Sequence, residues 1–182
     1  MGNEALCRHL LEYSVRTGDF TLKSGRRSTW FIDVKQTACR PEGILLIADA
    51  LLDALPPDID AIGGLTMGAD PIAFGTAAIA AARGRPLRSF SVRKESKDHG
   101  VTGRIAGALG PGDRVALTED ASTRGTSALE AAEAVRSFGA VPVLVVPVVD
   151  RGGTAAELSA AQGLAFRALV TAVDLGFDYE GA

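Results

Sequence analysis

Apolar and polar residues follow one another along the chain first with helical and then with extended spacing. Residues 5–15 place apolar side chains on one face of a helix, whereas residues 20–34 have the pattern of two short strands joined by residues 23–26. These segments are predicted to form a small N-terminal cap.

From Pro41 onward, helical and extended patterns alternate regularly. The predicted helices cover residues 44–55, 71–83, 127–138 and 155–161, and the predicted strands cover residues 61–64, 87–92, 115–118, 141–149 and 166–170. Strands connected through helices favour a parallel sheet with helices on both faces, so the expected fold class is α/β. Ligands of such sheets bind at the carboxyl ends of the strands, which directs attention to the loops there.

The length and composition fit one globular domain. A chain of 182 residues leaves little room for a second core, and 47% hydrophobic with 23% charged residues is typical of a folded protein. No apolar run is long enough to cross a bilayer, and the first residues lack the pattern of a secretory signal. A cytoplasmic protein with no membrane partner is therefore expected.

Charge and cysteine content narrow the kinds of site. The net charge of −3 gives no general attraction for nucleic acid or anionic lipid, so no nucleic-acid partner is expected and any anion site must be local. The two cysteines, Cys7 and Cys39, are too far apart for a zinc or redox motif. We expect both to be reduced packing residues.

The first candidate site follows the predicted strand at residues 115–118. Glu119 and Asp120 end this strand, and a loop rich in Gly, Thr and Ser then opens the next helix. Backbone N–H groups at a helix N-terminus suit a phosphate, and two carboxylates just before them could accept hydrogen bonds from vicinal ribose hydroxyls. The alternative is that the acids only end a strand and that Thr126 or Ser127 only caps the helix.

The second candidate site is a cation-rich stretch after the predicted strand at residues 87–92. It contains Arg93, Lys94, Lys97 and His99, whose side chains could stabilise charge on a leaving pyrophosphate. The alternative is an exposed turn of mixed charge. The only other histidine of the chain lies in the first predicted helix and is assigned no function.

Taken together, these motifs resemble the orotate branch of the type I phosphoribosyltransferases over about residues 20–176. Residues 119–127 are similar to the loop that binds phosphoribosyl pyrophosphate (PRPP) throughout that superfamily. Four further segments are similar to orotate enzymes in particular: residues 20–26, 30–33, 93–100 and 149–151. The resemblance implies transfer of ribosyl 5-phosphate from PRPP to orotate, giving orotidine 5′-monophosphate and pyrophosphate, in pyrimidine (UMP) biosynthesis.

The resemblance also implies an architecture and partners. It predicts a type I phosphoribosyltransferase fold, a Rossmann-like parallel sheet flanked by helices, as a single domain over residues 1–182. A small N-terminal hood would span about residues 1–40 and an α/β core about residues 41–175. A flexible catalytic loop within residues 93–104 would contact PRPP in the neighbouring subunit of a homodimer. Mg²⁺ would be carried mainly by PRPP, pyrophosphate and water, so no protein metal ligand is named.

Carried over by position, the resemblance assigns roles to individual residues. Lys97, His99 and Asp120 would be catalytic, with Asp120 facing the ribose diol. The residues implied to contact PRPP are Lys23, Arg93, Lys94, Lys97, His99, Glu119, Asp120, Ala121, Ser122, Thr123, Arg124, Gly125, Thr126 and Ser127. The residues implied to contact orotate are Phe31, Ile32, Thr123 and Arg151.

Arg151 determines the choice of base in this scheme. A guanidinium group matches a planar carboxylate with two parallel hydrogen bonds, and uracil, which lacks the carboxylate, would leave that group unpaired. The alternative is a surface ion pair between Arg151 and Asp150.

Three positions depart from the family pattern. Gly68 stands where some relatives have a phosphate-binding lysine, Arg124 stands where a small residue is usual, and Ala121 replaces a larger apolar residue. Two rival interpretations stay open: a phosphoribosyltransferase for another base, and a PRPP-sensing regulator without catalysis on the same fold.

Overall fold

The computed structural model describes residues 3–21, 27–97 and 103–179, with the backbone alone for residues 96 and 97. In the N-terminal part, α1 (Glu4–Tyr13) packs beside an antiparallel hairpin of β1 (Val15–Thr21) and β2 (Arg27–Ile32). The first strand begins at Val15, five residues earlier than predicted, because the helix ends at Tyr13.

The larger sheet has the strand order β5-β4-β3-β6-β7-β8, with β9 also pairing with β7. Its strands are β3 (Ala61–Leu65), β4 (Arg88–Lys97), β5 (Gly103–Gly107), β6 (Arg114–Ser122), β7 (Val141–Asp150), β8 (Ala165–Phe166) and β9 (Val170–Thr171). The remaining helices are α2 (Lys35–Ala38), α3 (Pro41–Ala54), α4 (Asp70–Ala82), α5 (Thr126–Phe138), α6 (Ala155–Ala161) and the 3₁₀ turn η1 (Val173–Leu175). The central strands pair in parallel, which confirms the expected α/β class.

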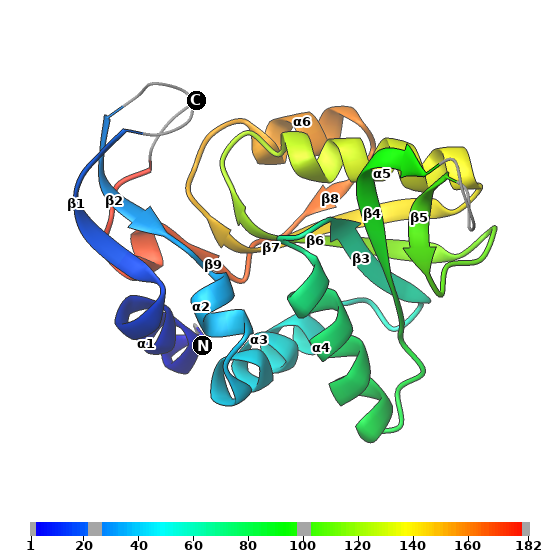
Figure 1. The fold of residues 1–182 in the computed structure, drawn as a ribbon, viewed down its shortest axis with the longest axis horizontal. Coiled ribbons are helices and arrows are strands. Elements are labelled where there is room, and N and C mark those ends of the chain that lie inside the picture. The colour runs from blue at the N-terminus through cyan, green and yellow to red at the C-terminus, as the bar shows by residue number, and fades with distance from the viewer. Residues whose placement is uncertain (1–2, 22–26, 98–102, 180–182) are drawn as a thin grey trace.

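Helices cover both faces of this sheet. Figure 1 shows α5 and α6 on one face and α3 and α4 on the other. Side chains along β6 alternate accordingly, since Val115 and Leu117 pack in the core under α5, whereas Ala116 packs in the core that contains α3. The sheet is therefore buried on both sides, as its apolar strands predict.

Two parts of the sheet differ from the expectation. Strand β4 continues past Val92 to Lys97 and pairs antiparallel with β5, which the sequence pattern did not predict. The cation-rich stretch is therefore extended strand through Lys97. The single strand expected at residues 166–170 is wrong: β8 and β9 pair with β7 as two separate short strands.

The carboxyl ends of β6 and β7 point toward the β1–β2 hairpin, so the loops that follow them lie next to the N-terminal elements (Figure 1). Within the described ranges, no helix has the length and apolar character needed to cross a membrane. The described fold thus directs attention to the space between β6, β7 and the hairpin.

Candidate functional site

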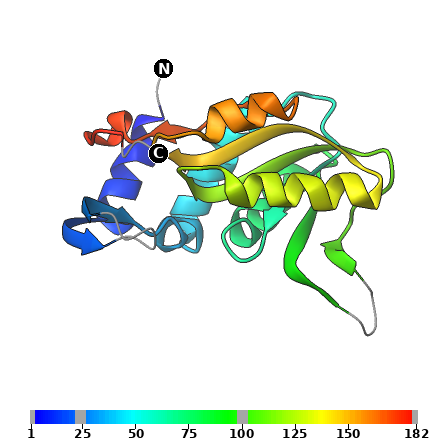
Figure 2. The same ribbon diagram turned by 90° about the horizontal axis from the view of Figure 1, so that it is seen from above.

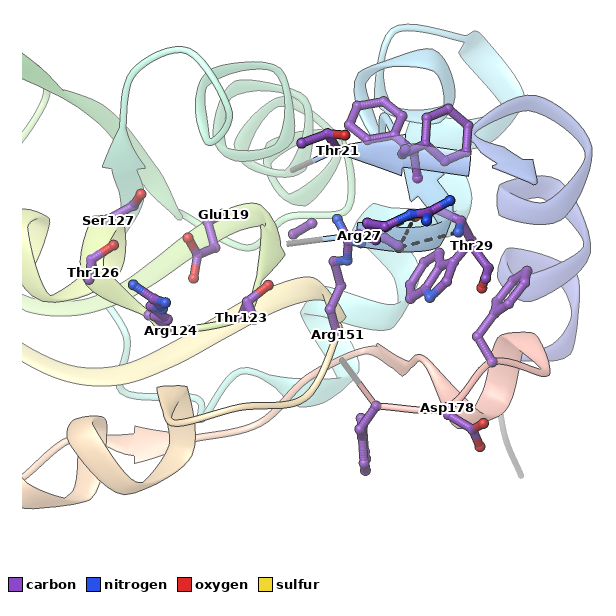
Figure 3. A pocket seen from close by; sticks show the side chains of 18 of the residues that line it. Thr21, Arg27, Thr29, Glu119, Thr123, Arg124, Thr126, Ser127, Arg151 and Asp178 are labelled. Atoms are coloured by element: carbon purple, nitrogen blue, oxygen red, sulfur yellow. Dashed lines mark hydrogen bonds between the residues drawn. The ribbon is translucent and has the colours of Figure 1, made fainter. Parts of the chain in front are cut away.

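A cleft of about 1180 Å³ opens between the carboxyl ends of β6 and β7 and the β1–β2 hairpin. Four segments far apart in the sequence form its walls: the hairpin, the β6–α5 loop, the residue after β7 and the C-terminal segment. Figure 3 shows Thr126 and Ser127 on one side of the cleft, Thr29 on the other, and Arg27 and Arg151 between them. The cleft thus joins residues from four of the segments that the sequence singled out: 20–26, 30–33, 119–127 and 149–151.

Helix α5 begins at this cleft, directly after Gly125. Gly125 has a φ of +72°, and a Cβ atom there would lie 3.0 Å from the Cα of Ala155 on α6, so the turn requires glycine. Thr126 and Ser127 line the cleft inside the first turn, and neither is the capping residue, because Gly125 holds that position. The first N–H groups of a helix lack intrahelical partners, so this end of α5 offers donors and a partial positive charge to an anion.

Glu119 is a buried carboxyl group at the edge of the cleft. Its residue is 7% exposed and lines the cavity, and Figure 3 shows it beside Thr123. Burial raises the pKa of Glu119 to about 7 against the effect of the Ser122 hydroxyl, and the negative charges of Asp120 and Asp150 add to the rise. Neither Oε1 of Glu119 nor Oγ of Ser122 makes a hydrogen bond of good geometry with the described residues. Oε1 of Glu119 is therefore suited to a hydroxyl-bearing ligand, whereas Ser122 is 1% exposed and is not among the described residues that line the cleft.

Asp120, the next residue on β6, turns to the other side of the strand. Its Oδ2 accepts a hydrogen bond of 2.7 Å from Nζ of Lys35, and its Oδ1 accepts one of 3.0 Å from the N–H of Ala121. A Cβ atom at Gly68 would lie 2.6 Å from Oδ1 of Asp120. The carboxylate thus lies between β6, the turn before α4 and the first residue of α2, and Asp120 is not among the described residues that line the cleft.

Arg151 follows β7 and is held by an aromatic side chain of the hairpin. Its residue is 8% exposed, and its guanidinium carbon lies 4.5 Å from the centroid of the Trp30 ring. Its Nη2 also donates to the Trp30 carbonyl over 3.4 Å. The carboxylate of Asp150 accepts a hydrogen bond of 2.9 Å from the N–H of Gly152. Arg151 thus presents a buried, oriented cation to the cleft.

The structure separates the two hairpin residues that were expected to contact the base. Phe31 is 41% exposed, lines the cleft and lies 5.9 Å from Phe20 between ring centroids. Ile32 is 5% exposed and packs in the hydrophobic core, because neighbouring residues of a strand face opposite sides. The cleft therefore brings together Phe31, Thr123 and Arg151, but not the side chain of Ile32.

The predicted catalytic loop begins as the β4–β5 hairpin. Arg93 Nη1 donates to the Gly103 carbonyl over 3.3 Å, and Arg104 Nε donates to the Arg93 carbonyl over 2.8 Å, so the two arginines brace the base of this hairpin. Lys94 is exposed. Figure 2 shows the hairpin leaving the body of the molecule at the end opposite β1 and β2. Of the described residues, none from β4 or β5 lines the cleft.

Three predicted residues cannot be placed by their side chains. Lys23 and His99 lie outside the described residues, and only the backbone of Lys97 is described. Arg124 lies in the described loop, where it is exposed and lines the cleft (Figure 3). Its position allows a contact with a bound anion, so the departure from the family pattern adds a cation to this wall.

Several residues of the site were missed by the sequence analysis. Arg27 and Thr29 line the cleft from β2, and Phe177 and Asp178 line it from the C-terminal segment. Lys35 was also missed, although it contacts Asp120. None of these residues belongs to a local motif, and only the fold brings them to the ends of β6 and β7.

Comparisons with known proteins agree on one family of relatives, although no protein-family model matches the sequence. The chain is 42% identical over 176 residues to the orotate phosphoribosyltransferase of Streptomyces avermitilis, an alignment that covers 96% of this chain and 97% of the relative. Its fold matches a crystal structure of Mycobacterium tuberculosis orotate phosphoribosyltransferase in complex with PRPP at a TM-score of 0.78 and 35% identity, covering 96% of this chain and 99% of that one. A phosphoribosyltransferase from Corynebacterium diphtheriae gives a TM-score of 0.85 at 35% identity, covering 97% of this chain and all of that one.

Proposed function

The chain belongs to the orotate phosphoribosyltransferase family, and from this premise we propose that PRPP binds along the β6–α5 loop and orotate between Phe31 and Arg151. Members of this family are pentosyltransferases of pyrimidine biosynthesis. The reaction moves ribosyl 5-phosphate from PRPP to orotate, which yields orotidine 5′-monophosphate and pyrophosphate. The residue roles below are part of the proposal.

One observation carries the proposal: a single cleft contains a helix N-terminus, a buried carboxyl group and a buried guanidinium. Thr126 and Ser127 of α5 suit the 5-phosphate, because backbone donors and hydroxyl groups meet there. Glu119 is placed for the ribose hydroxyls, since its Oε1 has no partner among the described residues. Arg151 lies across from them and suits the carboxylate of orotate. The spacing of the three groups follows the order phosphate, ribose, base.

Ribosyl transfer from PRPP to orotate depends on positioning of the two substrates and on charge compensation, and it requires no covalent enzyme intermediate. Holding the ribose and the base together replaces an encounter in solution by a reaction within one complex. Charge that builds on pyrophosphate would be stabilised by the cationic side chains within residues 93–100, among them Lys97 and His99. Asp120 would accept a hydrogen bond from the ribose diol and stabilise positive charge that develops at the sugar.

Mg²⁺ is proposed to arrive bound to PRPP. A small hard cation keeps several waters and binds phosphate oxygens readily, so it needs few protein ligands. The Glu119 and Asp120 side chains fit this arrangement. Each carboxyl group would accept a hydrogen bond from a ribose hydroxyl, and the oxygen of that hydroxyl can also face the ion. When bound, the ion supplies neutralisation of the pyrophosphate charge.

The protein is proposed to act as a single-domain, cytoplasmic homodimer in which each β4–β5 hairpin serves the site of the partner subunit. Two features support this arrangement. The hairpin leaves the molecule at the end opposite β1 and β2 (Figure 2), and none of its described residues lines the cleft of its own chain. A two-fold dimer could bring the hairpin of one subunit to the cleft of the other.

An assay with four bases tests the proposal. The purified protein is incubated with PRPP, Mg²⁺ and either orotate, uracil, adenine or hypoxanthine, and pyrophosphate release is followed. We expect turnover with orotate and a rate at least about a hundredfold lower with the other bases, because they lack the carboxylate that would pair with the Arg151 guanidinium. Equal turnover of uracil would identify an enzyme for another base. Binding of PRPP without any turnover would identify a regulator.

A further inference from the structure

Lys35, the first residue of α2, joins two carboxylates that come from distant parts of the chain. Its Nζ lies 3.0 Å from Oδ1 of Asp33 and 2.7 Å from Oδ2 of Asp120, which is 85 residues away in the sequence. The three side chains are partly exposed, at 38% for Lys35, 31% for Asp33 and 26% for Asp120. The ammonium group is thus the link between the N-terminal elements and the end of β6.

The position of the ammonium group is fixed from the side of α2. Oδ1 of Asp33 accepts a hydrogen bond of 3.3 Å from the backbone N–H of Lys35, and Oδ2 accepts one of 3.4 Å from the side chain of Gln36. Partial burial disfavours the charged form of Lys35, but the hydrogen bonds to Asp120 and Asp33 outweigh it and raise the pKa of Lys35. Lys35 therefore stays charged and directed toward Asp120.

The other sides of the Asp120 carboxylate are also fixed. Its Oδ1 accepts the N–H of Ala121, and the turn at Gly68 approaches so closely that a Cβ atom there would lie 2.6 Å from Oδ1. Residue 68 therefore cannot carry a side chain without displacing the carboxylate or shifting the turn. Some relatives have a lysine at the position of Gly68. In this chain the cation beside Asp120 is Lys35 of α2.

We propose that Lys35 is a positioning residue for PRPP: it holds the Asp120 carboxylate in one orientation at the carboxyl end of β6, and acts on the substrate through that carboxylate. This inference rests on the proposed function, because it takes Asp120 as the acceptor of the ribose hydroxyls. A purely structural role, tying α2 to β6, would stabilise the fold and leave PRPP affinity unchanged in a folded variant. The two roles therefore differ in what they predict for ligand binding.

The affinity for PRPP, measured by calorimetry with Mg²⁺ present and orotate absent, tests the proposal. The variants are Lys35→Met, Lys35→Arg, Asp120→Asn and the double variant Lys35→Met/Asp120→Asn. We expect Lys35→Met to weaken PRPP binding about tenfold or more, as for loss of a hydrogen bond to a charged group. Lys35→Arg should restore most of the affinity. In the Asp120→Asn background, Lys35→Met should change affinity by less than about twofold, because its partner is already gone. Urea unfolding shows whether each variant is folded.

Arg40→Met is the matched control, because Arg40 is a cation two residues beyond α2 that donates to the Gln36 carbonyl and stacks on Tyr13, away from Asp120. It should bind PRPP as the wild type does.

Gly68→Ala is a second variant that leaves Lys35 in place yet crowds Oδ1 of Asp120, and it too should weaken PRPP binding. The role of Lys35 would be overturned if Lys35→Met bound PRPP with wild-type affinity. It would also be overturned if the fold-losses of PRPP affinity in the two single variants multiplied in the double variant. Failure of the wild type to bind PRPP would overturn the proposed function together with it, whereas failure to turn over orotate would leave the Lys35 result interpretable.

Discussion

The guanidinium carbon of Arg151 lies 4.5 Å from the centroid of the Trp30 ring, and the same ring stacks on Phe177 at 4.6 Å with an interplanar angle of 8°. The guanidinium and the Phe177 ring therefore both pack against the Trp30 indole. Cation–π contact is strongest where water is excluded, and Trp30 is 2% exposed. The stack therefore fixes the plane of the guanidinium before any ligand arrives, which reduces the ordering needed to bind a planar carboxylate.

This stack gives a direct optical signal, because Trp30 is the single tryptophan of the chain. Orotate bound to Arg151 should alter the environment of the indole and produce a saturable change in its emission, after correction for absorbance by orotate itself. Uracil should titrate at a concentration about tenfold higher or more, since it lacks the group that pairs with the guanidinium. The Arg151→Lys variant keeps the charge but not the planar fork, and it should show weakened orotate binding. Identical titrations with orotate and uracil would contradict the assignment of Arg151.

The buried carboxyl group of Glu119 should make stability depend on pH. Its pKa is about 7 in the folded protein against an ordinary value of 4.5, so the folded state holds the proton more tightly than the unfolded state. Raising the pH from below 4.5 through 7 therefore lowers the free energy of unfolding. The contribution of Glu119 to stability is fully lost above pH 7. Glu119→Gln cannot ionise, so relative to the wild type its free energy of unfolding should rise by up to about 3 kcal/mol between about pH 4 and about pH 8.

Urea unfolding of both proteins at several pH values measures this difference. Glu133→Gln, at an exposed position of α5, controls for the removal of one negative charge and should show no comparable change with pH. A difference between Glu119→Gln and the wild type that is the same at low and high pH would show that Glu119 ionises normally in the folded state.

A shared site predicts that two inactive variants rescue each other. Lys97→Ala removes a cation of the β4–β5 hairpin, and Arg151→Ala removes the guanidinium of the cleft. In a mixed dimer, the intact hairpin of the Arg151→Ala chain reaches the intact cleft of the Lys97→Ala chain and rebuilds one complete site. With equal mixing and free exchange, half of the dimers are mixed, so roughly a quarter of all sites recover.

Co-expression of the two chains with different affinity tags isolates the mixed dimers for the rate measurement. A hairpin that serves its own chain would leave both sites of a mixed dimer defective, each through one change. Activity no higher than the mean of the two parent variants, in dimers shown to carry both tags, would therefore contradict the shared site.

Local pattern was sufficient to predict the central part of the fold. The helical spacing at residues 155–161 predicted α6 with its observed ends, and the apolar run at residues 141–149 predicted β7 to within one residue. The pairing of β4 with β5 was not predictable in the same way, because the polar residues after Val92 carry no extended pattern. What makes them a strand is hydrogen bonding to β5, a tertiary effect that propensity does not contain.

The candidate site was predictable only where its residues are neighbours in the sequence. The run from Glu119 to Ser127 shows a strand, two acids and a helix start together, so its chemistry is visible without a structure. The stack of Phe177, Trp30 and Arg151 joins residues that are far apart, and Lys35 reaches Asp120 across 85 positions. The position of Ile32 was not predictable for another reason: the motif gave its place in the sequence, but the alternation of β2 turns its side chain into the core.

The central claim is that orotate binds at the Arg151 end of the cleft and that PRPP binds at the carboxyl end of β6, where Asp120 would accept hydrogen bonds from the ribose hydroxyls. Steady-state titrations of Arg151→Ala and Asp120→Asn, each with orotate varied at saturating PRPP and with PRPP varied at saturating orotate, test it most directly. Arg151→Ala should raise the KM for orotate by about tenfold or more with little change in the KM for PRPP, and Asp120→Asn should do the reverse. An unchanged orotate dependence in Arg151→Ala, or equal effects of either variant on both substrates, would contradict this assignment of the two residues.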